Sequence, residues 1–332
     1  MTSPTTPTTS AARTSPRRPT EAAADALAGD PAADAPGVPG GERRWIRRDD
    51  GASICYQAFG ARDSARAPLL ILDGIGCSGW AFRRIIPALA EDRRVVLLHY
   101  RGHGLSVEPP RPWRLSMPTL ADDAAAALEH DRQERAVVVG FSMGFPVALE
   151  LFRRHRRRVA ALVSLAGPSG RVLRTFQGTQ AFGHVLPFVR ATTRFARDLT
   201  LKAWRALVPS NLTLGLGLNF QVNLDRIAVD DFEFYTRHLA EMNPELFVAM
   251  LEEADRHSAA DILDAIDVPT MVVAGARDTF VPLKTMRDLA FAVPQVRWKV
   301  LDQATHALPA EYPTEMTELL ASFADDLDRG EL

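Results

Sequence analysis

The chain has 332 residues, of which 46% are hydrophobic and 24% are charged, and it carries a net charge of −2. This composition is ordinary for a globular protein that is long enough to form one large α/β domain. The nearly balanced charge argues against a protein dedicated to binding nucleic acid.

The two cysteines, Cys55 and Cys77, imply no disulfide, so a reducing, cytoplasmic location is the default expectation. The sequence contains no secretory signal, no apolar run long enough to cross a bilayer and no Cys/His cluster of the kind that binds metal. It also lacks a glycine-rich loop followed by Lys-Ser or Lys-Thr, which would indicate phosphate binding. We therefore expect no integral membrane segment, no metal and no cofactor.

The first 42 residues are rich in Thr, Pro, Ala and Ser and contain almost no large apolar side chains. Such a segment cannot bury enough surface to fold, so residues 1–42 are predicted to be a disordered tail. Residues 47–54 follow as a predicted hairpin, with Asp50-Gly51 as its turn.

Strand and helix patterns then alternate, which predicts an α/β fold with a mostly parallel, doubly wound sheet. The predicted strands span residues 69–73, 94–99, 135–140, 159–166, 269–275 and 296–301. The predicted helices span residues 80–91, 118–130, 143–157, 283–293 and 311–327. The basic run at 153–158 falls at the end of the third of these helices, where cations oppose the helix dipole, so we expect a solvated helix terminus.

About a hundred residues separate the strand at 159–166 from the next strand at 269. A structureless loop of that length is implausible, so we predict a helical cap inserted over residues 168–262 between core segments 43–167 and 263–332. Helical spacing in the cap covers residues 195–207, 230–241 and 244–256. An apolar segment containing Leu214 and Phe220 either lines a lipophilic pocket or packs in the cap's own core. The cap histidines are expected to be surface or packing residues; they are His184, His238 and His257.

The most informative stretch is Gly140-Phe141-Ser142-Met143-Gly144, which follows a β-branched strand and precedes a helix. A G-x-S-x-G sequence in this context is typical of a sharp turn that exposes a nucleophilic serine. The glycines leave room where any Cβ would collide with a neighbouring strand or helix. Ser142 is therefore the predicted nucleophile, and the alternative is an ordinary serine in a glycine-rich turn.

A nucleophilic serine needs a base and an acid that orients the base. Asp278 lies in the loop after the strand at 269–275, and His306 lies in the loop after the strand at 296–301. Three strand ends on one edge of a parallel sheet would bring these side chains to Ser142. Taken singly, Asp278 could be a turn-former and His306 an unpartnered loop histidine.

Together with further stretches, this pattern resembles the α/β-hydrolase fold superfamily over about residues 43–328. The stretches that carry the resemblance are the hairpin at 47–54, the strand and glycine-rich loop at 69–76, the R-G-x-G-x-S sequence at 101–106 and the strand with its acid at 268–278. The resemblance implies that the backbone N–H groups of Ile75 and Met143 form the oxyanion hole. Phe141 and Cys77 are expected to line the pocket. A serine at this position argues against epoxide opening or dehalogenation, for which relatives use a carboxylate.

Two positions depart from the superfamily pattern. Asp73-Gly74 stands where His-Gly is usual, and His99 stands where an Asp usually precedes the R-G-x-G sequence. One hypothesis is that Asp73 and His99 form a swapped polar pair that braces the oxyanion loop; the alternative is two unrelated substitutions. A carboxylate beside the pocket also predicts modest activity or an unusual substrate.

The leading functional prediction is hydrolysis of a carboxylic ester of a moderately hydrophobic small molecule through an acyl-enzyme intermediate. Fold and residue pattern leave open a thioesterase, an amidase, a carbon–carbon bond hydrolase or a cofactor-free perhydrolase. A third hypothesis is a ligand-binding protein of the same fold without catalytic activity. The expected partner is a small ester or related acyl compound, and the sequence predicts no oligomeric state.

Overall fold

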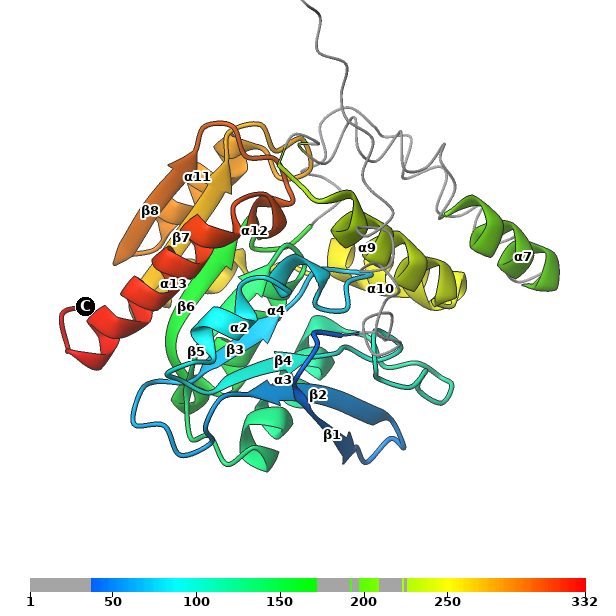
Figure 1. Cartoon of the computed structure of the whole chain (residues 1–332), viewed down its shortest axis with the longest axis horizontal. Helices are drawn as coiled ribbons and strands as arrows, with labels where there is room; N and C mark the ends of the chain where they lie inside the picture. Colours follow the sequence, from blue (N-terminus) through cyan, green and yellow to red (C-terminus); the bar gives the residue numbers. More distant parts are fainter. Residues whose placement is uncertain (1–36, 172–191, 193–196, 209–222, 224–225) are drawn as a thin grey trace, which may run out of the picture. The chain divides into compact units, whose positions relative to one another are not determined.

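The structure is a computed structural model that describes residues 37–171, 192, 197–208, 223 and 226–332. Its centre is an eight-stranded sheet in the order β1-β2-β4-β3-β5-β6-β7-β8 (Figure 1). The strands are β1 (Glu42–Arg47), β2 (Ser53–Phe59), β3 (Leu69–Leu72), β4 (Val95–Leu98), β5 (Ala136–Phe141), β6 (Val159–Leu165), β7 (Thr270–Gly275) and β8 (Val296–Leu301). Only β1 with β2 and β2 with β4 pair antiparallel. The remaining pairs are parallel, as the sequence predicts.

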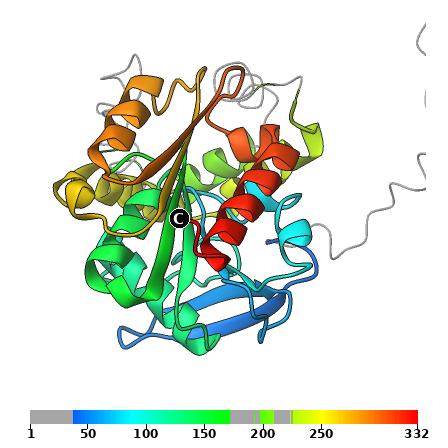
Figure 2. The ribbon, with the colours of Figure 1, turned by 90° about the vertical axis from the view of Figure 1, so that its left-hand side faces the viewer.

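The central strands are buried on both faces. Every residue of β3, β4, β5, β6 and β7 is buried, which suits their continuous apolar and β-branched sequences. One apolar cluster joins the sheet to α3 (Met117–His130), α4 (Gly144–Arg154) and α11 (Leu283–Ala292). A second cluster joins the other face to α2 (Ile86–Leu89), α12 (Leu308–Glu311) and α13 (Pro313–Asp328). Figure 2 shows α11 and α13 on opposite sides of the strands, so the sheet is doubly wound.

Two predicted helices are divided in the structure. The segment predicted as a helix over 80–91 forms a 3₁₀ turn at Trp80–Phe82 and the short helix α2, which begins just before Pro87. The segment predicted over 311–327 is preceded by α12 and begins as α13 at Pro313. Proline lacks an N–H donor and is tolerated only in the first helical turn, so helices restart at these residues.

The described residues between β6 and β7, where the sequence predicts an inserted cap, are mostly helical. The described helices are α7 (Arg197–Leu207), α9 (Val229–Glu241) and α10 (Pro244–Arg256). Hydrogen bonds from Arg171 N to His257 O and from Ala259 N to Ser169 O, both 2.8 Å long, join the two ends of this insertion. The insertion therefore leaves the core and returns to it at one place. Leu214, Phe220 and His184 lie outside the described residues.

Part of the segment that is predicted to be a tail is described, from residue 37 to residue 42. Val38 is buried, its N–H donates to the side-chain oxygen of Gln57 at 2.8 Å, and β1 begins at Glu42. The sequence does not indicate this contact, because one buried valine and its two hydrogen bonds with Gln57 hold the segment. No helix among the described residues is long and apolar enough to cross a membrane.

The basic run at 153–158 forms ion pairs with carboxylates from other elements. Bidentate contacts join Arg153 to Asp261 and Arg154 to Asp122, and Arg156 lies 2.6 Å from Asp267. Arginines that are paired in this way at a helix end stabilise the junction between elements and leave little charge for an external anion.

Candidate active site

Ser142 lies at the sharp turn between β5 and α4. Its φ of 52° is in the left-handed region, and its N–H donates to Leu165 O at 3.0 Å. A Cβ on Gly144 would lie 1.9 Å from Leu72 O, and a Cβ on Gly140 would lie 2.5 Å from the Cα of the facing helix residue. The strained turn is therefore possible only with glycine at both positions, as the sequence pattern predicts.

His306 lies in the loop after β8, and its Nε2 is 2.9 Å from Ser142 Oγ. The imidazole has two aromatic neighbours, with ring centroids 5.5 Å from that of Phe141 and 5.1 Å from that of Phe280. A Cβ on Gly275, at the end of β7, would come within 2.6 Å of two carbonyl oxygens of the histidine loop. The loop is thus packed directly against the sheet edge, which fixes where the imidazole can lie.

Asp278 completes the hydrogen-bonded chain. Its Oδ2 is 2.8 Å from His306 Nδ1, and its Oδ1 accepts N–H bonds from Phe280 at 2.8 Å and Val281 at 2.9 Å. The Asp278 side chain is only 1% exposed. A carboxylate can only accept, so Nδ1 carries the proton and Nε2 is left as the acceptor that faces Ser142. The structure thus brings together the three side chains that the sequence singles out.

The two predicted oxyanion donors come from different turns: Ile75 lies in the loop after β3, and Met143 directly follows Ser142. Within the described part of the chain, neither the Ile75 N–H nor the Met143 N–H donates a hydrogen bond. Asp73 holds the loop after β3 in place, because its two carboxylate oxygens accept the N–H groups of Gly74 and Gly79, each at 2.8 Å. Burial raises the pKa of Asp73 to about 6, against the opposing effect of these two hydrogen bonds.

The predicted pairing of Asp73 with His99 is wrong. His99 Nε2 is 3.1 Å from the side-chain oxygen of Gln57, and no hydrogen bond joins it to Asp73 among the described residues. The bracing role that the hypothesis gave to the pair belongs to Asp73 alone, since both its oxygens bond within the loop. His99 instead packs closely against Gly104, where a Cβ would lie 2.2 Å from its Nδ1.

Cys77 belongs to the same loop and is 7% exposed. Its sulfur accepts the indole N–H of Trp80 at 3.2 Å, and burial holds the pKa of the thiol well above its usual value. The thiol is therefore poorly suited to act as a nucleophile. Phe141 contacts His306, as described above, whereas the other two predicted pocket residues are outside the described part of the chain.

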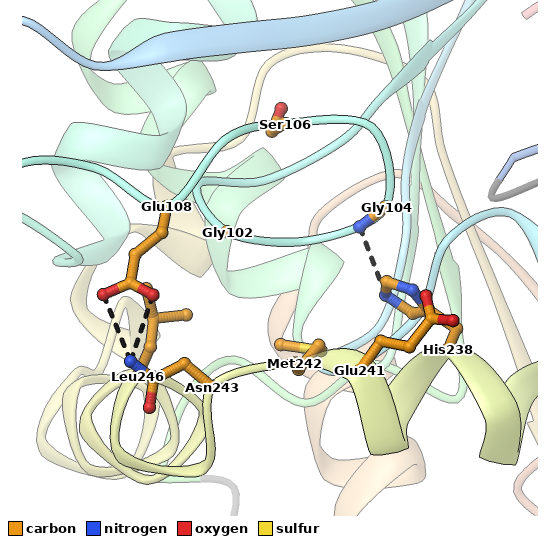
Figure 3. Close-up of a pocket in the computed structure, with 9 residues that line it drawn as sticks. All are labelled: Gly102, Gly104, Ser106, Glu108, His238, Glu241, Met242, Asn243 and Leu246. Carbon is orange, nitrogen blue, oxygen red and sulfur yellow. Dashed lines mark hydrogen bonds between the residues drawn. The ribbon is translucent and has the colours of Figure 1, made fainter. Parts of the chain in front are cut away.

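A cavity of about 250 Å³ lies apart from Ser142, between the loop at 102–108 and the junction of α9 with α10 (Figure 3). Its lining includes none of the three hydrogen-bonded residues. At its edge Gly104 N donates to His238 Nε2 at 3.1 Å, and Asn243 donates to both carboxylate oxygens of Glu108. His238 is buried, so it is a packing residue here, as predicted. Ser142 and its hydrogen-bonded partners are therefore not part of this cavity.

Sequence reasoning missed two residues that hold His306. The Phe280 ring contacts the imidazole at a tilt of 39°, and Glu311 accepts the N–H of Thr305 at 2.8 Å. Their closeness to the two predicted residues in the chain was the available signal, since each lies within five positions of Asp278 or His306. The sequence does not show which way the side chains of a loop point.

Comparisons with known proteins show to which family the chain belongs. The family model for the alpha/beta hydrolase fold matches residues 67–311. The chain belongs to the alpha/beta hydrolase fold family. The eight-stranded, mostly parallel sheet with helices on both faces is the fold that its neighbours share.

Two relatives of this alpha/beta hydrolase are similar over most of their length. A 2-hydroxymuconate semialdehyde hydrolase of Pseudomonas sp. (strain CF600) is 28% identical over 273 residues, covering 79% of this chain and 88% of the relative. A pimeloyl-[acyl-carrier protein] methyl ester esterase of Aeromonas hydrophila is 28% identical over 284 residues, covering 82% and 99%. Among solved structures, an esterase from Exiguobacterium antarcticum superposes with a TM-score of 0.68 at 20% identity, covering 86% of this chain and 100% of the esterase. The relatives are hydrolases, and the structural likeness shows the shared fold.

Proposed function

We propose that this alpha/beta hydrolase cleaves a carboxylic ester of a moderately hydrophobic small molecule through an acyl-enzyme at Ser142. The observation that carries the proposal is the continuous chain of hydrogen bonds from Asp278 through His306 to Ser142. The methyl ester esterase among the relatives supports the choice of an ester. The aromatic rings of Phe141 and Phe280 beside the imidazole support an apolar substrate group.

In the first half of the reaction, Ser142 Oγ attacks the carbonyl carbon while His306 Nε2 takes the hydroxyl proton. The carbonyl π bond opens, and its electron pair moves to the oxygen. Asp278 holds the Nδ1–H and stabilises the imidazolium. When the tetrahedral intermediate collapses, the ester C–O bond breaks and the imidazolium returns the proton to the departing alcohol oxygen.

The negative oxygen of the intermediate is met by the N–H groups of Ile75 and Met143. Both groups are without an intramolecular acceptor in the described chain, so they are available to it. Losing one such donor typically costs on the order of 3 kcal/mol of transition-state stabilisation. A water that gives its proton to His306 then attacks the acyl carbon, and the carboxylic acid leaves as Ser142 recovers its proton.

The test is turnover of p-nitrophenyl esters of increasing acyl length by the wild type and by Ser142→Ala. The wild type should keep or gain rate beyond the acetyl ester, and Ser142→Ala should lose on the order of 10⁶ in kcat. Ser64→Ala is the control, because Ser64 lies in the loop before β3, at the opposite edge of the sheet. Equal rates for wild type and Ser142→Ala would contradict the mechanism. A steady fall from acetyl upward would contradict the apolar acyl preference.

A second candidate comes from the relative named for hydrolysis of 2-hydroxymuconate semialdehyde, which is as similar to this chain as the esterase is. The same serine, imidazole and oxyanion groups can serve hydrolysis of such a compound. Including 2-hydroxymuconate semialdehyde in the panel separates the two candidates. A kcat/KM for it far above that of every ester would replace the ester assignment.

A further inference from the structure

Glu311, the last residue of α12, is 3% exposed and carries a carboxylate with several partners. Its Oε2 accepts the N–H of Thr305 at 2.8 Å, and its Oε1 accepts the N–H of Asn223 at 2.8 Å. The hydroxyl of Thr305 also donates to Oε1. A buried carboxylate is stable only with such donors. Here the described donors belong to two segments: Thr305, in the loop just before α12, and Asn223, which is far away in the sequence.

The first of these segments controls the imidazole. Thr305 directly precedes His306, so the bond to Glu311 fixes the backbone from which the imidazole projects. On its other side the same loop is confined by Gly275, where a side chain would come within 2.6 Å of the Thr305 carbonyl oxygen. Between these two contacts the loop has little freedom, which keeps His306 Nε2 at 2.9 Å from Ser142 Oγ.

The second segment leads into the helices inserted between β6 and β7. The carbonyl of Asn223 accepts the N–H of Arg226 at 2.9 Å and of Ile227 at 3.2 Å. The turn before α9 means these three described residues. The Asn223 side chain also donates to Gln303 O at 3.5 Å, so this turn contacts the histidine loop at a second point. One carboxylate therefore joins the histidine loop to the segment that precedes α9.

We propose that Glu311 is a positioning residue that couples the placement of His306 to the seating of the turn before α9. The inference rests on the proposed function, since it assigns Glu311 a part in the reaction of Ser142. Glu311 touches neither the substrate nor the reacting atoms. With Glu311 in place, the imidazole is held for proton transfer while the turn is docked. Without it, the described link between the loop and the turn is reduced to the 3.5 Å hydrogen bond from Asn223 to Gln303 O.

The test is Glu311→Gln, which keeps the size of the side chain but offers an NH₂ group where an acceptor is needed. We expect kcat to fall by about 10- to 100-fold with KM nearly unchanged, because a misplacement of about 1 Å costs rate and not ground-state binding. Labelling of Ser142 by a fluorophosphonate should slow by a similar factor. Glu150→Gln is the matched control: Glu150 is 4% exposed, lies in α4 and pairs with Arg153 and His257, away from the histidine loop.

The outcomes separate the coupling from the proposed function. If wild type neither turns over esters nor reacts with the fluorophosphonate, the proposed function fails. If wild type does both and folded Glu311→Gln keeps its kcat, or if Glu150→Gln falls equally, the positioning role is overturned. If Glu311→Gln does not fold, Glu311→Asp takes its place in the test. Aspartate keeps the negative charge, but its side chain is too short to accept from both Thr305 and Asn223. A wild-type kcat in folded Glu311→Asp overturns the proposal, and a lowered kcat with unchanged KM supports it.

Discussion

Acid should destabilise the folded protein through three buried histidines, of which one lies in α9 and two lie at or just after the end of β4. They are His99, His103 and His238, which are 2%, 0% and 7% exposed. Burial lowers the pKa of His99 and of His238 to about 3 and that of His103 to about 4, from an ordinary value of 6.5. The neighbouring histidines add to the effect on His99 and His238 by charge repulsion. The folded state therefore holds all three rings neutral.

The sign follows from proton uptake. Below an ordinary pKa of 6.5 the unfolded chain binds protons that the folded chain excludes, so the free energy of unfolding decreases as the pH falls from 6.5 toward 4 and 3. At about pH 5 each histidine costs about 2 kcal/mol, at about 1.4 kcal/mol per pH unit. Asp73 acts in the opposite direction, because its raised pKa of about 6 lets the folded chain bind a proton that the unfolded chain does not bind. At about pH 5 this adds about 1.4 kcal/mol to the free energy of unfolding. The net loss from these four groups is on the order of 4–5 kcal/mol, a large part of a typical domain stability.

The assay is urea unfolding at about pH 7.5 and about pH 5, for wild type and for His99→Gln. Glutamine can still donate to Gln57, the partner of His99. All other groups titrate in both proteins and cancel in the comparison. We expect the stability lost between the two pH values to be smaller in His99→Gln by about 2 kcal/mol. An equal loss in both proteins would refute the reasoning that burial holds His99 neutral.

Three further predictions concern the site. Asp278→Asn should lower kcat by on the order of 10⁴ while the unfolding midpoint stays near wild type; near-normal turnover would mean that another acid orients His306. Gly144→Ala should prevent folding of the nucleophile turn, because its Cβ would lie 1.9 Å from Leu72 O; a stable, active variant would refute the geometric need for glycine. Iodoacetamide at about pH 8 should leave activity intact, because burial raises the pKa of the Cys77 thiol. Inactivation that parallels alkylation of Cys77 would contradict this.

The sheet was predictable because its strands have strong patterns. The strands at 69–72, 95–98, 136–141, 159–165, 270–275 and 296–301 each fall within a residue of the predicted bounds. Buried parallel strands are continuous apolar runs, and the loops between them carry turn residues. The helix at 80–91 was overestimated, because Pro87 lies inside the predicted range and its missing N–H is tolerated only in the first turn of a helix, where α2 places it.

The three residues of the hydrogen-bonded chain were predictable for a different reason. Each follows the end of a parallel strand, and the ends of such strands meet at one edge of the sheet. The partners of Asp73 were not predictable, because its carboxylate bonds to backbone N–H groups of its own loop. Nearly every residue has a backbone N–H group, so the type of a residue does not show whether its N–H binds a given carboxylate. For the same reason the contact of Glu311 with Thr305 and Asn223 appears only in the structure.

The most direct measurement is the mass of the intact protein after reaction with a fluorophosphonate probe, followed by peptide mapping of the adduct. A serine held 2.9 Å from an imidazole nitrogen should be phosphonylated once, at Ser142. Ser142→Ala should gain no mass under the same conditions. A wild-type protein that stays unmodified, or an adduct mapped to any other residue, would contradict the assignment of Ser142 as the nucleophile.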